Sequence, residues 1–284
     1  MKELGVIIPT YNRFEIVSRL LGILEKQDLA RRFFSVTVID DGSSDGTFVN
    51  LRKRKWKLDL KILKQKNSGQ AKARNVALKA VQTKYILFLG DDILPCDNGF
   101  LRRHLRALRA SDKRTAFLGF TTWQPVLARD RFRLWLEKGG PQFDYRGLKD
   151  GSKTDFWHFY TSNVSLPRAL LAHEKFDEKF AGYGWEDVEL AYRLVKKHSL
   201  QIKFLEQARA YHCHALTETS VWKRVPEMKT AGLYFERKHP EIRILPHGLK
   251  WFLLWFFTRR PVIFLARKIK PEWGWYLRFK REFL

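Results

Sequence analysis

The first ninety residues alternate between short apolar runs and segments with the apolar period of a helix, and this alternation restricts the fold most. The expected strands lie at residues 6–8, 36–39, 60–63 and 85–89, and the expected helices lie at 14–26, 47–55 and 71–81. Such alternation is typical of a mostly parallel sheet with helices on both faces. We therefore predict an α/β fold.

Residues that follow the strands are the first candidates for a site, because ligands of such sheets bind beyond the carboxyl ends of the strands. Three polar segments lie there: Pro9, Thr10, Tyr11 and Asn12; Asp40 and Asp41; and Asp91 and Asp92. Adjacent carboxylates repel each other unless a cation lies between them, and Mg²⁺ or Mn²⁺ would also bind a nucleotide's phosphates. An isolated Asp-Asp pair is more often a solvated turn, but the second acidic strand end favours a binding site.

The segment from Asn67 to Arg74 is a candidate for phosphate contact. Gly69 opens an expected helix, whose first N–H groups and positive end attract anions. Lys72 or Arg74 would reinforce that attraction, although an arginine on a surface helix is usually only solvated.

Residues 101–160 have a less regular pattern, and a compact unit follows, with strands expected at 161–166 and 208–214 and helices at about 186–197 and 218–238. Gly184 and Trp185 precede Glu186 and Asp187 at the start of one of these helices. Acidic residues are favoured there by the helix dipole, so a structural role is an alternative. The glycines and the indole face also suit contact with a sugar ring.

His212 and His214 alternate along an expected strand and therefore point to the same face. A lone histidine is more often structural. A same-face pair near acidic loops is also a candidate for metal ligation.

The formal net charge of +24 favours a polyanionic neighbour such as nucleic acid, an anionic membrane face or a phosphorylated substrate. A hydrophobic content of 45% excludes a disordered chain. Two cysteines, Cys96 and Cys213, are too few for a disulfide framework and favour a reducing compartment. No uninterrupted apolar run approaches the ~20 residues of a membrane-spanning helix.

Five segments match a known family in its order: 6–13 (VIIPTYNR), 38–47 (VIDDGSSDGT), 67–75, 88–95 (FLGDDILP) and 176–190. Together they resemble the family 2 glycosyltransferases, whose GT-A fold has a Rossmann-like, mostly parallel sheet flanked by helices. By this resemblance residues 1–215 form the catalytic domain, with a nucleotide-sugar-binding half at 1–95 and an acceptor half at 96–215. A helical extension at 216–246 and a basic, aromatic helical appendage at 247–284 follow.

The resemblance implies a role for each matched residue. The residues implied to bind the nucleotide sugar are Pro9, Thr10, Tyr11, Asn12, Asp41, Asn67, Gly69, Arg74, Asp91 and Asp92. Asp41 reads the base and Arg74 contacts the diphosphate; Asp92 holds the metal with His212 or His214, of which His212 is preferred. Asp187 is the general base, Glu186 is a second catalytic residue as an acceptor-hydroxyl or loop contact, and Trp185 and Gly184 contact the acceptor. Gly90 departs from the family, because many members carry the first aspartate of the metal motif there.

The implied function is inverting, Mn²⁺- or Mg²⁺-dependent transfer of a hexosyl or N-acetylhexosaminyl group from a nucleoside diphosphate sugar, with a UDP-sugar favoured. The acceptor is a hydroxyl of a glycan or a lipid-linked glycan. The alternatives are a non-catalytic relative and a basic nucleic-acid-binding protein. Acidic strand ends argue against nucleic acid as a partner, because they repel its phosphates.

Residues 247–284 carry nine basic and two acidic residues, a net +7, with four of the ten tryptophans. Such a segment suits the headgroup layer of an anionic membrane. We expect a cytoplasmic enzyme attached peripherally to the inner face of the cell membrane. The alternative is a helix packed on the catalytic domain.

Overall fold

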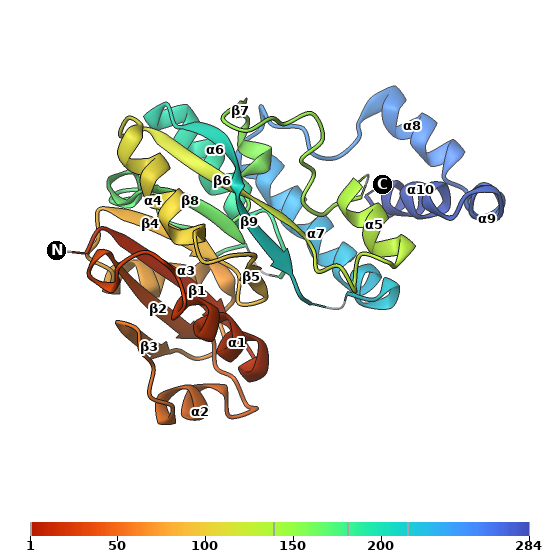
Figure 1. Cartoon of the computed structure of the whole chain (residues 1–284). Coiled ribbons are helices and arrows are strands. Elements are labelled where there is room, and N and C mark those ends of the chain that lie inside the picture. Colours follow the sequence, from red (N-terminus) through yellow and green to blue (C-terminus); the bar gives the residue numbers. More distant parts are fainter. Residues whose placement is uncertain (1, 139, 181, 215, 284) are drawn as a thin grey trace. The chain divides into compact units, whose positions relative to one another are not determined.

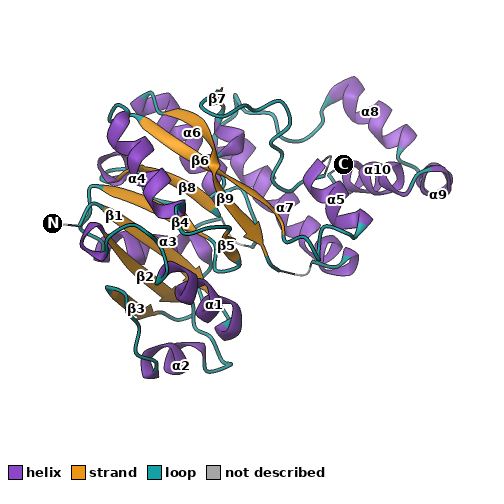
Figure 2. Cartoon of the chain, viewed as in Figure 1, coloured by secondary structure: helices purple, strands orange, loops and turns teal. Residues whose placement is uncertain are grey.

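The computed structural model of the chain describes residues 2–138, 140–180, 182–214 and 216–283. These residues form two units. The first comprises Met1–Leu127, Tyr145–Glu178 and Glu186–His214, and the second comprises Ala128–Asp144, Lys179–Trp185 and Ala215–Leu284. The first unit contains the sheet, and the regular structure of the second is helical (Figures 1 and 2).

One nine-stranded sheet runs through the first unit in the order β3-β2-β1-β4-β8-β6-β9-β5, with β7 paired to β9. Its strands are β1 (Leu4–Thr10), β2 (Phe34–Asp40), β3 (Leu60–Lys64), β4 (Tyr85–Leu89), β5 (Ile93–Pro95), β6 (Thr115–Trp123), β7 (Lys153–Thr154), β8 (Asn163–Pro167) and β9 (Gln201–His212). The pairs β1–β2, β2–β3 and β1–β4 are parallel, as the alternation with helices predicts. β8 runs antiparallel to both β4 and β6, while β6 and β9 are parallel again.

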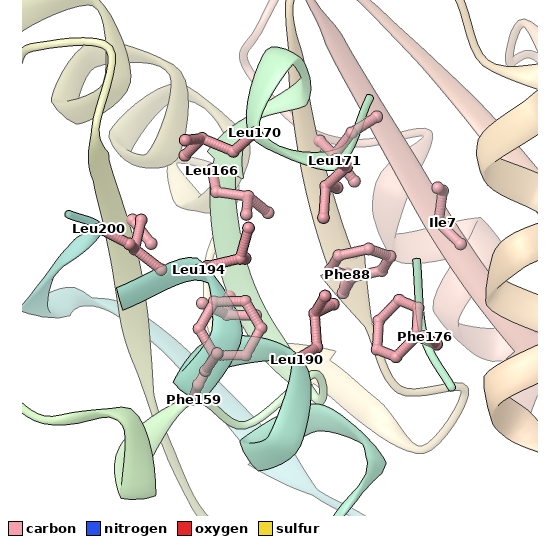
Figure 3. Close-up of a cluster of buried hydrophobic side chains, with 14 of the residues drawn as sticks. Ile7, Phe88, Phe159, Leu166, Leu170, Leu171, Phe176, Leu190, Leu194 and Leu200 are labelled. Carbon is pink, nitrogen blue, oxygen red and sulfur yellow. The ribbon is translucent and has the colours of Figure 1, made fainter. Parts of the chain in front are cut away.

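Five helices belong to the first unit: α1 (Phe14–Leu24), α2 (Thr47–Lys53), α3 (Gln70–Ala80), α4 (Phe100–Ala110) and α6 (Glu186–His198). The side chains of α3 and α6 join the apolar face of the sheet in one buried cluster. Figure 3 shows Phe88 of β4, Phe176 and Leu190 of α6 in this cluster, and the rings of Phe88 and Phe176 meet edge to face at 5.3 Å. This packing fixes the start of α6 beside the sheet.

The opposite face of β8 receives α4. Val164 and Leu166 join the buried cluster, whereas Asn163 and Ser165 point the other way, as the two-residue period of a strand requires. His104 of α4 contacts Ser165 Oγ at 2.8 Å through Nδ1 and Asn163 Oδ1 at 3.0 Å through Nε2. Burial lowers the pKa of His104 to about 4, so this histidine is a neutral structural residue.

Residues 101–160, whose sequence pattern is less regular, contain more regular structure than that pattern predicts. It contains most of α4, all of β6 and the helix α5 (Arg131–Lys138). In α4 the buried Leu101, Leu105 and Leu108 follow the helical period, and the arginines lie on the other side of the helix. β9 likewise begins at Gln201, before the expected start at 208.

The second unit combines α5 with α7 (Glu218–Lys238), α8 (Gly248–Phe257), α9 (Arg260–Ile269) and α10 (Pro271–Glu282). Its aromatic core joins Phe132 and Trp135 of α5 to Trp275 of α10, with ring centroids 5.0 and 5.8 Å apart. Trp222 of α7 lies 6.4 Å from Trp135. Because of this core, α5 groups with the C-terminal helices, although its sequence lies within the expected 96–215 half.

Candidate active site

Three strand ends meet at one edge of the first unit's sheet. Thr10 ends β1, Asp41 follows β2, and Asp91 follows β4 with one residue between. The Thr10 hydroxyl donates to Asp91 Oδ2 at 2.7 Å, and the Asp41 amide donates to the Thr10 carbonyl at 2.9 Å. All three residues are buried. The polar segments that the sequence placed at strand ends are therefore in direct contact.

One arginine from the loop after β1 neutralises the acidic pair. Arg13 Nη1 lies 2.8 Å from Asp91 Oδ1 and 2.7 Å from Asp92 Oδ2, and His212 Nε2 lies 3.4 Å from the same oxygen of Asp92. Burial and the Asp92 charge raise the pKa of Asp91 to about 6, against the opposing effect of Arg13. Burial alone would also raise the pKa of Asp92, but the hydrogen bond and charge of His212, with Arg13, hold it below its usual range. Asp92 is thus the permanent anion of the pair.

Asp41 organises the loop between β3 and α3. Its Oδ1 accepts from Gln65 Nε2 at 2.6 Å and from the Ser68 amide at 2.9 Å, and its Oδ2 accepts from the Gly69 amide at 2.9 Å. The amide of Gly69 therefore serves Asp41 instead of an outside ligand. Asn67, in the same loop, is exposed. A nucleoside that contacts Asp41 has to share or replace these donors.

The residues between β1 and α1 connect to the loop after β2. Asn12 has a φ of 51°, and its Oδ1 accepts from the Ser44 amide at 2.8 Å. Its own amide donates to Ser43 Oγ at 2.8 Å. Pro9 is half-buried in β1, whereas Tyr11 is exposed beside these loops. Tyr11 is thus available to a ligand, while Asn12 maintains the loop.

The second acidic pair begins α6 and is held by an arginine from α3. Arg74 Nη1 donates to Glu186 Oε1 at 2.8 Å, and Nη2 donates to Gln70 Oε1 at 2.8 Å. The guanidinium also lies over the ring of Phe176, 5.4 Å from its centroid. Arg74 and Glu186 are both buried. Arg74, the predicted diphosphate contact, and Glu186, the predicted acceptor-hydroxyl or loop contact, therefore form one ion pair.

Asp187 accepts hydrogen bonds from neutral donors. Its Oδ2 accepts from the Thr161 amide at 3.2 Å and hydroxyl at 3.3 Å, and Oδ1 accepts from the Val188 amide. Burial, followed by the neighbouring charge of Glu186, raises the pKa of Asp187 to about 6, and Arg74 only partly opposes this. A carboxylate with such a pKa is ionised at neutral pH and is a stronger base than an ordinary aspartate. The geometry suits a proton acceptor.

This arrangement of strand ends and acidic pairs lies within a recognised family. Residues 5–165 match the model of glycosyl transferase family 2. The chain belongs to that family. The predicted resemblance is thereby confirmed, and the match includes Thr10, Asp41, Arg74 and the Asp91–Asp92 pair, while the Glu186–Asp187 pair lies beyond it.

A similar curated protein is the validoxylamine A glucosyltransferase of Streptomyces hygroscopicus subsp. jinggangensis. It is 30% identical over 284 residues, and the alignment covers 91% of this chain and 64% of that protein. The chain thus spans less than two thirds of the length of this relative.

Two solved structures have the same fold. The mannosyltransferase of Pyrobaculum calidifontis, in complex with GDP-Man and Mn²⁺, aligns with a TM-score of 0.67 at 18% identity, over 99% of this chain and 85% of that chain. TarS of Staphylococcus aureus, in complex with UDP-GlcNAc, aligns with a TM-score of 0.61 at 21% identity, over 99% and 82%. These likenesses confirm the predicted GT-A fold.

The residues around Asp92 fit a metal that is shared with a substrate. A carboxylate and an imidazole nitrogen lie together in Asp92 and His212, and the charge of His214 also lowers the pKa of Asp92. Among the described residues, no three His, Cys, Asp or Glu side chains are placed to hold an ion by themselves. Metals of nucleotide sites commonly take one or two protein carboxylates and complete their shell with phosphate oxygens and water. The donor set here agrees with that type of site.

Gly90 has a steric reason to differ from the aspartate of many family members. A Cβ at this position would lie 2.8 Å from Cγ1 of Ile93, so a larger residue would have to displace that side chain. The Gly90 amide donates to the Ser162 carbonyl at 3.0 Å. The turn at Gly90 thus places Asp91 and Asp92 directly after β4.

The predicted acceptor contacts belong to the second unit. Gly184 and Trp185 both have positive φ, at 94° and 73°. The Trp185 indole donates to the Met228 carbonyl of α7 at 2.8 Å and lies edge to face with Phe235 at 6.3 Å. Its packing within this unit is defined, and its contact with an acceptor stays a prediction.

Sequence reasoning missed the residues that hold the carboxylates in place. Arg13 lies inside the matched segment 6–13 and Thr161 at an expected strand start, but neither was assigned a role. A basic residue three positions after a strand end was the available signal for Arg13. Its partners are 78 and 79 positions away, so only the fold identifies them.

Proposed function

We propose that this chain transfers a hexosyl or N-acetylhexosaminyl group from a nucleoside diphosphate sugar to a hydroxyl of a glycan or lipid-linked glycan, with inversion at the anomeric carbon. The observation that carries the proposal is the Asp187 carboxylate, which has a raised pKa and hydrogen-bonded neutral partners in a family 2 chain. UDP-sugars are the favoured donors, supported by the neighbour that holds UDP-GlcNAc. The neighbour with GDP-Man makes guanosine donors the first alternative to test.

Asp187 would accept the proton of the acceptor hydroxyl while that oxygen bonds to the anomeric carbon. An alcohol is far too weak an acid to lose this proton unaided at neutral pH, so base assistance lowers the barrier. The bond from the anomeric carbon to the diphosphate oxygen breaks, and its electron pair leaves with the diphosphate. Attack opposite the leaving group inverts the centre, and one base is enough.

The leaving diphosphate gathers negative charge that the site has to stabilise. Asp92 with His212 or His214 would hold Mn²⁺ or Mg²⁺, and such an ion neutralises this charge when it is bound. Thr10, Asp41 and the loop of Asn67 would bind the nucleoside, and Asp41 would exchange a loop donor for one from the base. Arg74 fixes Glu186, so that the orientation of Asp187 at the start of α6 is defined before an acceptor arrives.

Donor hydrolysis tests this proposal directly. The full chain is incubated with UDP-glucose, UDP-GlcNAc and GDP-mannose, with Mn²⁺ or with a chelator, and released nucleotide and the anomer of the free sugar are followed by NMR. We expect one donor to be hydrolysed with inversion, and the rate to fall in chelator. Retention of configuration would contradict the single-base mechanism, and no hydrolysis or binding of any nucleotide sugar would favour a non-catalytic relative.

A further inference from the structure

The helices α8 and α9 present apolar side chains to solvent along their length. In α8, Leu249, Phe252 and Phe256 are spaced three and four residues apart, and in α9 Val262, Leu265 and Ile269 have the same spacing. Each set therefore lies on one side of its helix. These six side chains, here called the apolar stripes, are between 37% and 74% exposed. Exposed apolar surface of this extent usually marks an interaction site.

The neighbouring helix α10 has buried side chains, in contrast to α8 and α9. Trp275 of α10 is buried against Phe132 and Trp135, and Glu272 pairs with Arg131 at 2.9 Å. None of the side chains of α8 and α9, which are described in full, is buried. Arg281 of α10 donates to the Thr258 carbonyl between α8 and α9 at 2.9 Å, so α10 anchors the junction of the two helices. The alternative expectation, that the C-terminal segment is a packed helix, thus applies to α10, which packs against α5 in the second unit.

Basic residues lie directly beside the stripes. Arg259 lies between the two helices and Arg260 begins α9, and the Arg259 guanidinium lies over the Trp255 ring at 4.5 Å. Lys268 lies over the Phe264 ring at 4.6 Å. A second copy of the chain would bring the same positive charge against this surface, which repels it. An anionic surface with an apolar interior complements both properties.

We propose that α8 and α9 lie in the headgroup layer of an anionic bilayer, with the apolar stripes in its outer hydrocarbon and the basic residues at its phosphates. Among the described residues, no helix combines the length and hydropathy needed to span a bilayer. The ten residues of α8 measure about 15 Å at 1.5 Å per residue, about half of a hydrocarbon core. α9 has the basic and apolar faces of an interfacial helix, whereas α8 is apolar around most of its circumference, with Trp251, Leu253, Trp255 and Phe257 also 40–53% exposed. This inference does not depend on the proposed transferase activity.

The test is flotation of the full chain with vesicles of phosphatidylcholine, alone or mixed with phosphatidylglycerol. We expect binding to the anionic vesicles that weakens at high salt, because screening shortens the reach of surface charges. Arg259→Gln with Arg260→Gln should weaken it by about 25-fold, at about fivefold for each basic residue removed. Lys53→Gln with Lys55→Gln, the same charge change on the exposed surface of the first unit, should change it far less.

The apolar contribution is tested by Phe256→Asp with Leu265→Asp, against the control Val49→Asp with Val126→Asp, which changes equally exposed apolar residues elsewhere. Only the first pair should abolish flotation, and melting curves should show that both variants stay folded. Donor hydrolysis in the stripe variant separates a membrane defect from a failure of the proposed activity. Equal flotation of both variants would overturn the proposal. So would loss of a dimer in the stripe variant by light scattering, which would assign the stripes to a second copy of the chain.

Discussion

The two acidic pairs of the first unit differ in how an arginine holds them. At the end of β4, Arg13 bridges both carboxylates, with distances of 2.8 Å to Asp91 and 2.7 Å to Asp92. At the start of α6, Arg74 bonds to Glu186 at 2.8 Å, while Asp187 accepts from the neutral amides of Thr161 and Val188. Burial and a neighbouring anion raise the pKa of Asp91 and of Asp187 to about 6 alike. In the first pair, His212 and Arg13 nevertheless keep Asp92 charged, so this pair suits cation binding. In the second pair, Asp187 accepts from neutral donors, so this pair suits proton transfer.

The largest effect is expected when the base of the second pair is neutralised. Asp187→Asn keeps the shape of the side chain but removes the proton acceptor, so we expect transfer to fall by about 10²–10⁴-fold. Binding of the donor, measured by calorimetry, should stay close to that of the unchanged chain. Asp112→Asn, which removes an exposed carboxylate bonded to Thr115 and Arg114, is the matched control. Near-normal turnover of the Asp187 variant would exclude it as the base.

Loss of the arginine from the second pair should cost stability. Arg74→Met leaves Glu186 buried without its cation, which typically destabilises a protein by about 3–5 kcal/mol. Arg74→Met with Glu186→Gln should recover most of this loss, because neither side chain then carries a charge. Arg13→Met should cost less, because 28% of the Arg13 side chain is already exposed. Urea unfolding measures all three variants, and equal losses for Arg74→Met and Arg13→Met would contradict the difference in burial.

The sequence predicted the elements whose side chains repeat with a clear period. The strands β1 to β4, the helices between them and the meeting of their ends all follow from local pattern and the rules of parallel sheets. It did not predict α4 and β6, although the buried leucines of α4 follow the helical period. Arg13 and Arg74 were also out of reach as counterions, since Arg74 and Glu186 are 112 positions apart. Such ion pairs depend on the packing of whole elements and have no local signal.

The first pair can be tested by its affinity for a cation. Asp92→Asn removes the carboxylate nearest His212, and we expect Mn²⁺ affinity to fall by about 10–100-fold. Arg13→Gln should act in the opposite direction and strengthen Mn²⁺ binding on the order of tenfold, because a resident positive charge is removed from both carboxylates. Electron paramagnetic resonance of free Mn²⁺ measures both changes without any turnover. An unchanged affinity in both variants would assign the pair to structure alone.

The smallest effect concerns the pH dependence of the two pairs. With a pKa of about 6, Asp187 is ionised above that pH, so kcat/KM should rise as pH increases through about 6 and then level off. Asp91 has a pKa of about 6 as well, so the position of this limb alone does not identify the group. Glu186→Gln separates them, because the charge of Glu186 raises the pKa of Asp187, whereas the charge of Asp92 raises the pKa of Asp91. We expect this variant to move the limb to lower pH by about one unit or less.

The folding stability of the chain also depends on the titration of Asp187, but it falls with increasing pH where kcat/KM rises. The folded pKa of Asp187 lies above its unfolded value, so the folded chain binds more protons and its stability falls as pH rises from about 4 to about 6. Asp187→Asn removes the ionised form and should therefore raise the melting temperature at pH 8 relative to the unchanged chain, by an effect of up to about 3 kcal/mol. At pH 4 the difference should nearly vanish, because both side chains are then neutral. Two results together would contradict this assignment: a rise of kcat/KM at the same pH in Glu186→Gln, and no pH-dependent stabilisation in Asp187→Asn. Asp91 would then be the group that titrates near pH 6, and the two pairs would not differ in their roles.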